Sequence, residues 1–587
     1  EASKAEGYMS FSDDGLEQLA NWIDHDDVVE EPDEQTDKVA RRKALSIISG
    51  IGIGSLVFQR ALSAQIPSAG EIEASHIAAA EWVAGVELDE SDRESLVNEF
   101  NAVRATSQIL LEAQVDYAIH PAVHMNVHED PQQVADANAK RNGVVISLPR
   151  EKLSVDNNDD IGFATIAELA AMLRKKQISS SELTRIYLDR LTTYDQQLLC
   201  VVNFCEESAM KQAAVADEQL SKGKELGLLH GIPWGAKDLI AYPGYPTTWG
   251  APCFENQEFD YKATVASRLD DAGAVLIAKL SLGALAMGDK WFRGMTRNPW
   301  NTEQGSSGSS AGSASATAAG LVGFSLGSET YGSIVSPSRR CGTSGLRPTY
   351  GRVSRAGCMP LTWSMDKIGP ICRSVSDCAL VFDAIHGTDG EDPTVKDYPF
   401  NWSDNMSLKG LRVGVFEGDR QPGEQETIDI LEERGARLVT IELPSDIPVQ
   451  ALVMILFCEA GTVFDDITRD GVTEGLNRWP GLFRRARFTN AADYLKANRI
   501  RTQLIHKMRD TMKDIDIYIG SPASELLITN LTGHPTVVMP AGFNEKDGRK
   551  TPFSITMTGQ LFGESKLLAA AHAFQQETSY HRERPVL

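Results

Sequence analysis

The chain has 587 residues, which is long enough for several average domains or for one large domain with appendages. It carries 81 acidic and 57 basic residues, a formal net charge of −24, and so acidic a surface repels phosphate backbones. Because no run rich in Lys and Arg is interleaved with aromatic residues, we exclude nucleic acid as a direct partner. The eight cysteines form no C-x-x-C pair, which argues against a disulfide scaffold and a zinc ribbon.

Residues 1–65 are predicted to be an acidic leader followed by an export signal. The first 40 residues are polar and acidic, a composition typical of disorder. Arg41 and Arg42 then precede a mildly apolar run from Ala44 to Phe58, an order that resembles a twin-arginine signal. The run is shorter than the roughly 20 residues that span a bilayer, so we expect no stable membrane insertion. We therefore expect export to the periplasm or cell envelope; the alternative is a buried helix in a cytoplasmic protein.

Residues 66–160 are predicted to be a helical N-terminal extension followed by a connector. Apolar residues recur at steps of three and four between about 73 and 118, which favours helices. His120, His124 and His128 then recur every four residues, a spacing that suits metal ligands on a helix. Pro121 interrupts that segment and no carboxylate–histidine frame surrounds it, so we predict a loop and no metal site.

Residues 161–587 are predicted to be an α/β domain. Two helices begin it, and Ser179 with Glu182 three residues later forms the pattern of a capping box for the second. Apolar runs then alternate with helical patterns, and these runs are typical of strands buried on both faces of a sheet. Examples are "GAVLIAKL", "GLVGFSLG", "LRVGVFEG" and "HPTVVMPAG".

The stretch "QGSSGSSAGSASATAAG" at 304–320 has the composition of a flexible linker, but apolar strand-like segments follow it directly. Glycines and small hydroxyl residues suit a loop whose N–H groups hold an oxyanion. Ser310 in "GSSAG" formally matches a nucleophile elbow. No strand–turn–helix context precedes Ser310, which disfavours the hydrolase class that uses such an elbow.

Four segments together resemble the amidase signature family: "GLLHGIPWGAKDLI" (227–240), "SGSSAGSASATAAG" (307–320), "GSETYGSIVSPSRRCGTSGLRPTYGRVS" (327–354) and "NLTGHPTVVMPAGF" (530–543). The family includes amidases, fatty-acid amide hydrolases and the catalytic component of the tRNA-dependent amidotransferase. The resemblance covers about 163–587. It implies an α/β fold with a large mixed β-sheet flanked by helices, to which this chain adds the helical N-terminal region.

The resemblance implies a Ser–cis-Ser–Lys triad. The family's lysine corresponds to Lys237, its first serine, joined by a cis peptide, to Ser309, and its nucleophile to Ser333. A lysine base must be neutral, which burial favours. Ser309 would then take the proton of Ser333 and pass its own to Lys237. Ser310 would support the site.

The same resemblance places the oxyanion at the backbone N–H groups of Thr330, Tyr331, Gly332 and Ser333. Tyr331 stands where a glycine is common, and we expect its ring to narrow the acyl pocket. Glu329 replaces a common Asp and Val335 a common Arg. If those two residues normally pair, we expect Arg339 or Arg340 to supply the missing charge.

The sequence therefore predicts an exported amidohydrolase that cleaves a small-molecule amide through an acyl-enzyme, without cofactor or metal. One alternative is the glutaminase component of an amidotransferase, which uses the same triad. The second is a non-catalytic binding protein on the same fold, which the intact Lys237, Ser309 and Ser333 disfavour. A homodimer is the assembly we consider, and esters are also chemically possible substrates.

Overall fold

The computed structural model describes residues 71–112, 123, 143–150, 157–521, 525–546 and 548–587. Ile72–Leu587 form one compact unit. The predicted leader and export signal, together with His120, His124 and His128, lie outside the described residues. In the described part of the chain, no helix combines the length and the apolar character that crossing a bilayer requires.

Two helices of the predicted N-terminal extension are present, α4 (Ala74–Ala84) and α5 (Glu90–Glu112). Helix α5 packs against α18 (Trp479–Ala486) and α19 (Ala491–Met512). Phe100 meets Phe488 edge to face, with ring centroids 4.5 Å apart. Asp92 and Glu99 of α5 form ion pairs with arginines at the C-terminal end of α18. The helical extension is thus tied to the main domain by both apolar and ionic contacts.

The domain begins with the two predicted helices, after the short α7 (Asn158–Gly162): α8 (Ile166–Arg174) and α9 (Ser180–Leu198). Ser179 caps α9 by accepting from the backbone N–H of Glu182, and the Glu182 side chain accepts from the N–H of Ser179. This reciprocal capping box satisfies two donors that the helix itself cannot use. The local prediction is confirmed.

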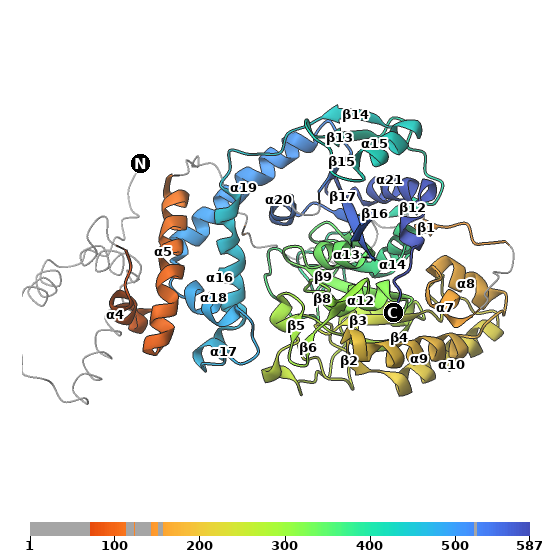
Figure 1. Cartoon of the computed structure of the whole chain (residues 1–587), viewed down its shortest axis with the longest axis horizontal. Helices are drawn as coiled ribbons and strands as arrows, with labels where there is room; N and C mark the ends of the chain where they lie inside the picture. The colour runs from red at the N-terminus through yellow and green to blue at the C-terminus, as the bar shows by residue number, and fades with distance from the viewer. Residues whose placement is uncertain (1–70, 113–122, 124–142, 151–156, 522–524, 547) are drawn as a thin grey trace, which may run out of the picture. The chain divides into compact units, whose positions relative to one another are not determined.

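The core of the domain is one 11-stranded mixed sheet, as predicted. In spatial order its strands are β14 (Arg437–Thr440), β13 (Arg412–Val415), β15 (Ile517–Gly520), β17 (Arg549–Gly559), β16 (Thr536–Lys546), β10 (Ser344–Arg347), β11 (Lys367–Cys372), β9 (Phe324–Glu329), β3 (Pro233–Lys237), β4 (Val275–Leu280) and β2 (Val201–Phe204). The four apolar runs named from the sequence became β4, β9, β13 and β16. Every residue of β4 is buried, because helices cover the sheet (Figure 1).

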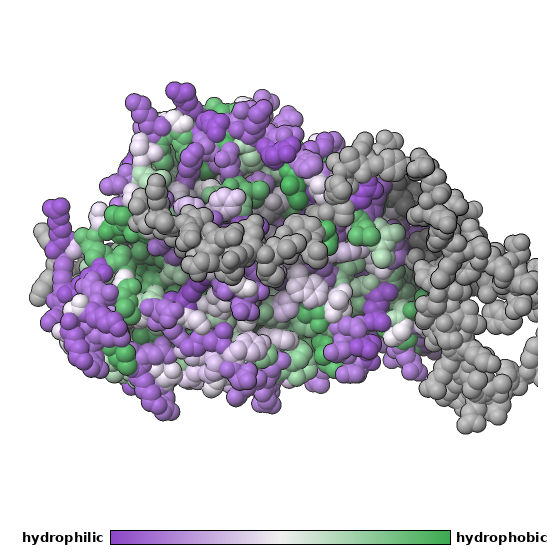
Figure 2. Space-filling view, turned by 180° about the vertical axis from the view of Figure 1, so that it is seen from behind, coloured by the Kyte–Doolittle hydropathy of each residue, from purple (hydrophilic) through white to green (hydrophobic). Residues whose placement is uncertain are grey.

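Helices line this sheet from α9 and α10 beside β4 to α15 near β13 and β14 (Figure 1). The further helices are α10 (Glu206–Ser221), α11 (Thr264–Asp271), α12 (Ala311–Ala318), α13 (Val335–Cys341), α14 (Val375–Ile385), α15 (Glu424–Glu433), α16 (Val453–Val463), α17 (Asp465–Arg469), α20 (Leu526–Thr532) and α21 (Glu564–Glu577). Short strand pairs are β1 (Gly143–Val145) with β12 (Asn401–Ser403), β5 (Lys290–Trp291) with β6 (Gly294–Met295), and β7 (Arg297–Asn298) with β8 (Asn301–Gly305). On the face in Figure 2, hydrophilic residues predominate and hydrophobic ones form patches between them.

The topology brings three strand ends to one edge of the sheet. Strand β3 runs parallel to β9, so Lys237 and Glu329 end at the same edge. Strand β11 runs antiparallel to β9 and begins there, with Lys367 opposite Glu329. Side chains from distant sequence segments therefore meet where β3 and β9 finish.

The stretch at 304–320 is a packed helix and its approach, not a linker. All eight residues of α12 are buried, and the helix begins at Ala311, two residues before the predicted start near Ser313. A Cβ on Gly308 would lie 1.8 Å from the carbonyl oxygen of Gly288. A Cβ on Gly312 would lie 2.4 Å from that of Cys200. Small residues are required here because backbone segments approach one another closely.

Candidate active site

Lys237 lies at the end of β3 with its side chain completely buried. Its Nζ lies 2.8 Å from Ser309 Oγ, 3.1 Å from Ser310 Oγ and 2.9 Å from Ser328 Oγ. The structure thus brings together the predicted lysine and both members of the predicted serine pair. All three contacts are to neutral hydroxyl groups.

A second buried lysine shows how unusual that environment is. Lys279 of β4 lies 2.7 Å from the carboxylate of Asp238, and both side chains are fully buried. Buried charges are normally paired in this way, because a lone charge in the interior is costly. Lys237 has hydroxyl contacts where Lys279 has an ion pair, so its surroundings favour a neutral amine.

Burial lowers the pKa of Lys237 to about 7, while the charges of Asp366 and Glu329 act in the opposite direction. A neutral amine has two N–H donors and one lone pair. Ser310 gives its own proton to the carbonyl oxygen of Ser328 at 3.1 Å, so toward the lysine it acts as an acceptor. Ser309 can then donate its hydroxyl proton to the lone pair of Lys237, as a proton relay requires.

A pH dependence follows from this pKa. Because the neutral amine is the form that accepts a proton, kcat/KM for an amide should fall as pH drops through about 7 and level off above it. The measurement is a pH profile between pH 5 and 9 with a neutral substrate. A profile that is flat down to pH 5, in protein that stays folded, would contradict a lysine base.

The serine pair is held by the backbone around it. The peptide bond between Gly308 and Ser309 is cis, as the resemblance implied. Ser310 is the residue that precedes α12, and its N–H donates to the carbonyl oxygen of Ser333 at 3.1 Å. That bond joins the segment of Ser309 directly to the segment of the predicted nucleophile. Ser333 itself is 9% exposed.

The loop from Thr330 to Ser333 carries the predicted oxyanion donors. Gly332 has φ +88°, a conformation that favours glycine. The N–H groups of Ile334 and Val335, just beyond the loop, both donate to Glu329 Oε2, at 2.8 and 2.9 Å. Those of Tyr331, Gly332 and Ser333 have no acceptor among the described residues, which leaves them available to an oxyanion.

Arg347, not Arg339 or Arg340, is the partner of Glu329, which corrects the expectation from sequence. Arg347 Nη1 lies 2.7 Å from Glu329 Oε1, and both side chains are fully buried. Arg339 and Arg340 are exposed at the end of α13. The arginine comes from β10, where antiparallel pairing with β16 and β11 carries it under the loop.

The Glu329–Arg347 pair predicts a stability effect. Arg347→Met leaves the Glu329 carboxylate buried without its cation, so we expect the free energy of unfolding to fall by about 3–5 kcal/mol. Urea denaturation measures this change. The matched control is Arg549→Met, which breaks a solvent-exposed pair with Glu303 and should leave stability unchanged within error. Equal effects of the two variants would contradict a buried clamp.

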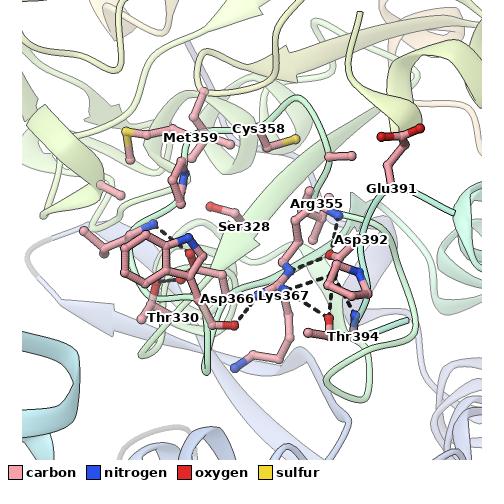
Figure 3. A pocket seen from close by; sticks show the side chains of 18 residues that line it. Ser328, Thr330, Arg355, Cys358, Met359, Asp366, Lys367, Glu391, Asp392 and Thr394 are labelled. Atoms are coloured by element: carbon pink, nitrogen blue, oxygen red, sulfur yellow. Dashed lines mark hydrogen bonds and ion pairs between the residues drawn. The ribbon is translucent and has the colours of Figure 1, made fainter. Parts of the chain in front are cut away.

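Tyr331 does not lie where the sequence led us to expect it. Its side chain is 42% exposed, and it is absent from the lining of the cavity beside the lysine. The cavity has a volume of about 340 Å³ and is bounded by Ser328 and Thr330 near the site and by the loops after β10 and α14 (Figure 3). Its walls are mostly apolar.

Two functional side chains escaped the sequence analysis. Ser328 contacts Lys237, and its place at the carboxyl end of β9 is the signal that could have found it. Asp366 accepts from the hydroxyl of Thr330 and from the backbone N–H groups of Leu361 and Thr362. Asp366 is fixed beside the oxyanion loop only through the antiparallel register of β11 and β9, which no local pattern reveals.

Residues 182–526, more than half of the chain, match the family model described as Amidase. The chain belongs to the amidase signature family. The matched segment contains Lys237, Ser309 and Ser333. Among the described residues, no three His, Cys, Asp or Glu side chains lie close enough together to hold a metal ion.

Relatives within the family are similar over most of their length. The A-type subunit of the glutamyl-tRNA(Gln) amidotransferase of Moorella thermoacetica is 33% identical over 491 residues, covering 73% of this chain and 99% of that protein. The native peptide amidase from Stenotrophomonas maltophilia is 27% identical, with a TM-score of 0.64, covering 72% of this chain and 98% of that one. An amidase family protein from Bacillus anthracis is 25% identical with a TM-score of 0.65, covering 75% and 96%. The family and the fold predicted from sequence are confirmed.

Proposed function

We propose that this amidase signature protein hydrolyses a small-molecule amide through an acyl-enzyme on Ser333. The observation that carries the proposal is the buried Lys237, which has hydroxyl contacts and no carboxylate at its amine. Such a lysine is available as a base near neutral pH. The assignment of roles to the three residues rests on this geometry together with the family resemblance.

In the proposed mechanism, Ser333 attacks the amide carbonyl while its proton passes to Ser309 and the proton of Ser309 passes to Lys237. The N–H groups of Tyr331, Gly332 and Ser333 stabilise the oxyanion, with that of Thr330 as the fourth candidate. When the C–N bond breaks, the relay returns the proton to the leaving amine. Water then attacks the acyl-enzyme by the same route, which frees the carboxylic acid and restores Ser333.

The second candidate is a glutaminase that feeds ammonia to an amidotransferase. It is favoured by the 33% identity to the amidotransferase protein of Moorella thermoacetica, which spans 99% of that relative. The chemistry at the serine is the same in both candidates. They differ in whether turnover needs a second protein and whether glutamine is the substrate.

A panel of simple amides, peptide amides, glutamine and esters, offered to the purified chain alone, tests the proposal. We expect release of amine or ammonia from at least one non-glutamine amide with no other protein present. Activity restricted to glutamine would favour the second candidate. Binding of amides without turnover of any substrate would favour a non-catalytic protein.

We also propose, from sequence alone, that the chain is exported. Arg41 and Arg42 with the apolar run after them support this proposal. Replacement of both arginines by lysine should retain the protein in the cytoplasm, as cell fractionation would measure. A wild-type protein found in the cytoplasm would leave the alternative, a cytoplasmic enzyme.

A further inference from the structure

The cavity of about 340 Å³ lies on the side of the site where the leaving amine must be. The proposed mechanism requires the amine to receive its proton from the Ser309–Lys237 relay. Ser328, whose hydroxyl contacts Lys237, is also part of the cavity wall. Thr330, at the start of the oxyanion loop, is another part of that wall. An amide bound at Ser333 can therefore extend its nitrogen substituent into this space.

Most charged groups in the cavity wall are already engaged. Arg355 lies 2.8 Å from Asp392, and it also donates to Thr394 at 2.9 Å, as the dashed lines of Figure 3 show. Asp366 is committed to Thr330 and to backbone N–H groups. The Lys367 amine donates to the carbonyl oxygen of Met365. These interactions fix the wall and leave little charge for a ligand.

Glu391 is the exception. It is exposed, and in the described part of the chain its carboxylate has neither a hydrogen bond nor an ion pair. In Figure 3 it stands clear of the other labelled side chains, on the side away from Thr330. Trp363, 48% exposed, contributes an aromatic face to the same cavity. A carboxylate and an indole both attract a positive charge, and the apolar wall between them suits a hydrocarbon body.

We propose that this cavity selects amides whose amine portion has an apolar body and a distant positive charge. The proposal rests on the proposed function and adds a substrate class to it. Glu391 and Trp363 are its specificity-determining residues. Because Glu391 lies at a solvated rim, its effect should be moderate and should weaken as salt screens it.

The test compares amides of one acyl group with four amines: ammonia, benzylamine, 4-(aminomethyl)benzylamine mono-acylated at one nitrogen, and 4-carboxybenzylamine. At low salt we expect kcat/KM for the cationic amide to exceed that for the anionic amide by about tenfold. The difference should shrink to about twofold in 0.5 M NaCl. Equal kcat/KM values for the two would overturn the proposal.

Variants locate the effect. Glu391→Gln should remove most of the preference and Glu391→Lys should invert it, while hydrolysis of the unsubstituted amide stays within about twofold. Glu433→Lys makes the same change in net charge at an exposed position on α15 and should leave the preference intact. Trp363→Ala should weaken binding of both benzyl amides, seen as a higher KM. A preference unaltered in Glu391→Lys would overturn the assignment.

A mirrored series, with the charge on the acyl portion, separates the two sides of the substrate. Sensitivity to Glu391 in that series and not in the amine series would overturn the placement of the leaving amine. Failure of the proposed function looks different, because then the wild-type chain cleaves none of these amides. The unsubstituted amide therefore reports on function, and the ratio between charged amides reports on the cavity.

Discussion

Ser333→Ala should lower kcat for the best amide substrate by about 10⁴-fold or more, with little change in the free energy of unfolding. A missing nucleophile cannot be replaced by the rest of the triad, because the residues act as one unit. The loop should keep its shape, since the backbone bond between Ser310 and Ser333 and the Glu329 clamp do not involve the Ser333 hydroxyl. Steady-state kinetics on the two purified proteins measure the loss.

Ser336→Ala is the matched control for that experiment, because it removes a hydroxyl three residues away on the first turn of α13. We expect the control to retain activity within about tenfold. A Ser333→Ala protein that keeps a substantial fraction of wild-type activity, after removal of contaminating enzyme, would show that another group performs the attack.

Lys237→Met should cost at least about 10³-fold in kcat/KM and should abolish the fall of activity below pH 7. Methionine keeps the apolar length of the side chain but supplies no base, so Ser309 would have nowhere to pass its proton. Because Lys237 carries no ion pair, its loss orphans no buried charge, and the protein should remain folded. Circular dichroism and the pH profile complete the measurement.

The histidine control makes this result specific to lysine. His534 is buried near the Glu329 clamp, where Arg347 donates to its carbonyl oxygen, and burial lowers its pKa to about 3. His534→Gln should leave kcat within about tenfold of wild type. If it abolished activity while Lys237→Met did not, the triad assignment would be wrong.

Much of the fold was predictable because its signals are local. The capping box of Ser179 and Glu182 spans four residues, and the apolar runs of β4, β9, β13 and β16 need only a buried face on each side. The small residues around Ser309 were predictable as a close-packed loop for the same reason. The family resemblance then placed Lys237 beside the serine pair, where the structure has it.

The parts that escaped prediction depend on register across the sheet. Arg347 reaches Glu329 because β10 lies between β11 and β16, whereas sequence distance favoured Arg339 and Arg340. Asp366 supports Thr330 because β11 begins opposite the end of β9. The cavity arises from loops after β10 and α14 that meet only in the folded chain. Such contacts follow from tertiary pairing and not from any local pattern.

The most direct test of the central claim is the site of covalent labelling by a fluorophosphonate. The probe should add once per wild-type chain, and mass spectrometry of the peptides should place the adduct on Ser333. Ser333→Ala should take up none, and wild-type labelling should slow below pH 7 as Lys237 becomes protonated. An adduct on Ser309 or Ser310, or a catalytically active wild-type chain that never labels, would contradict the account.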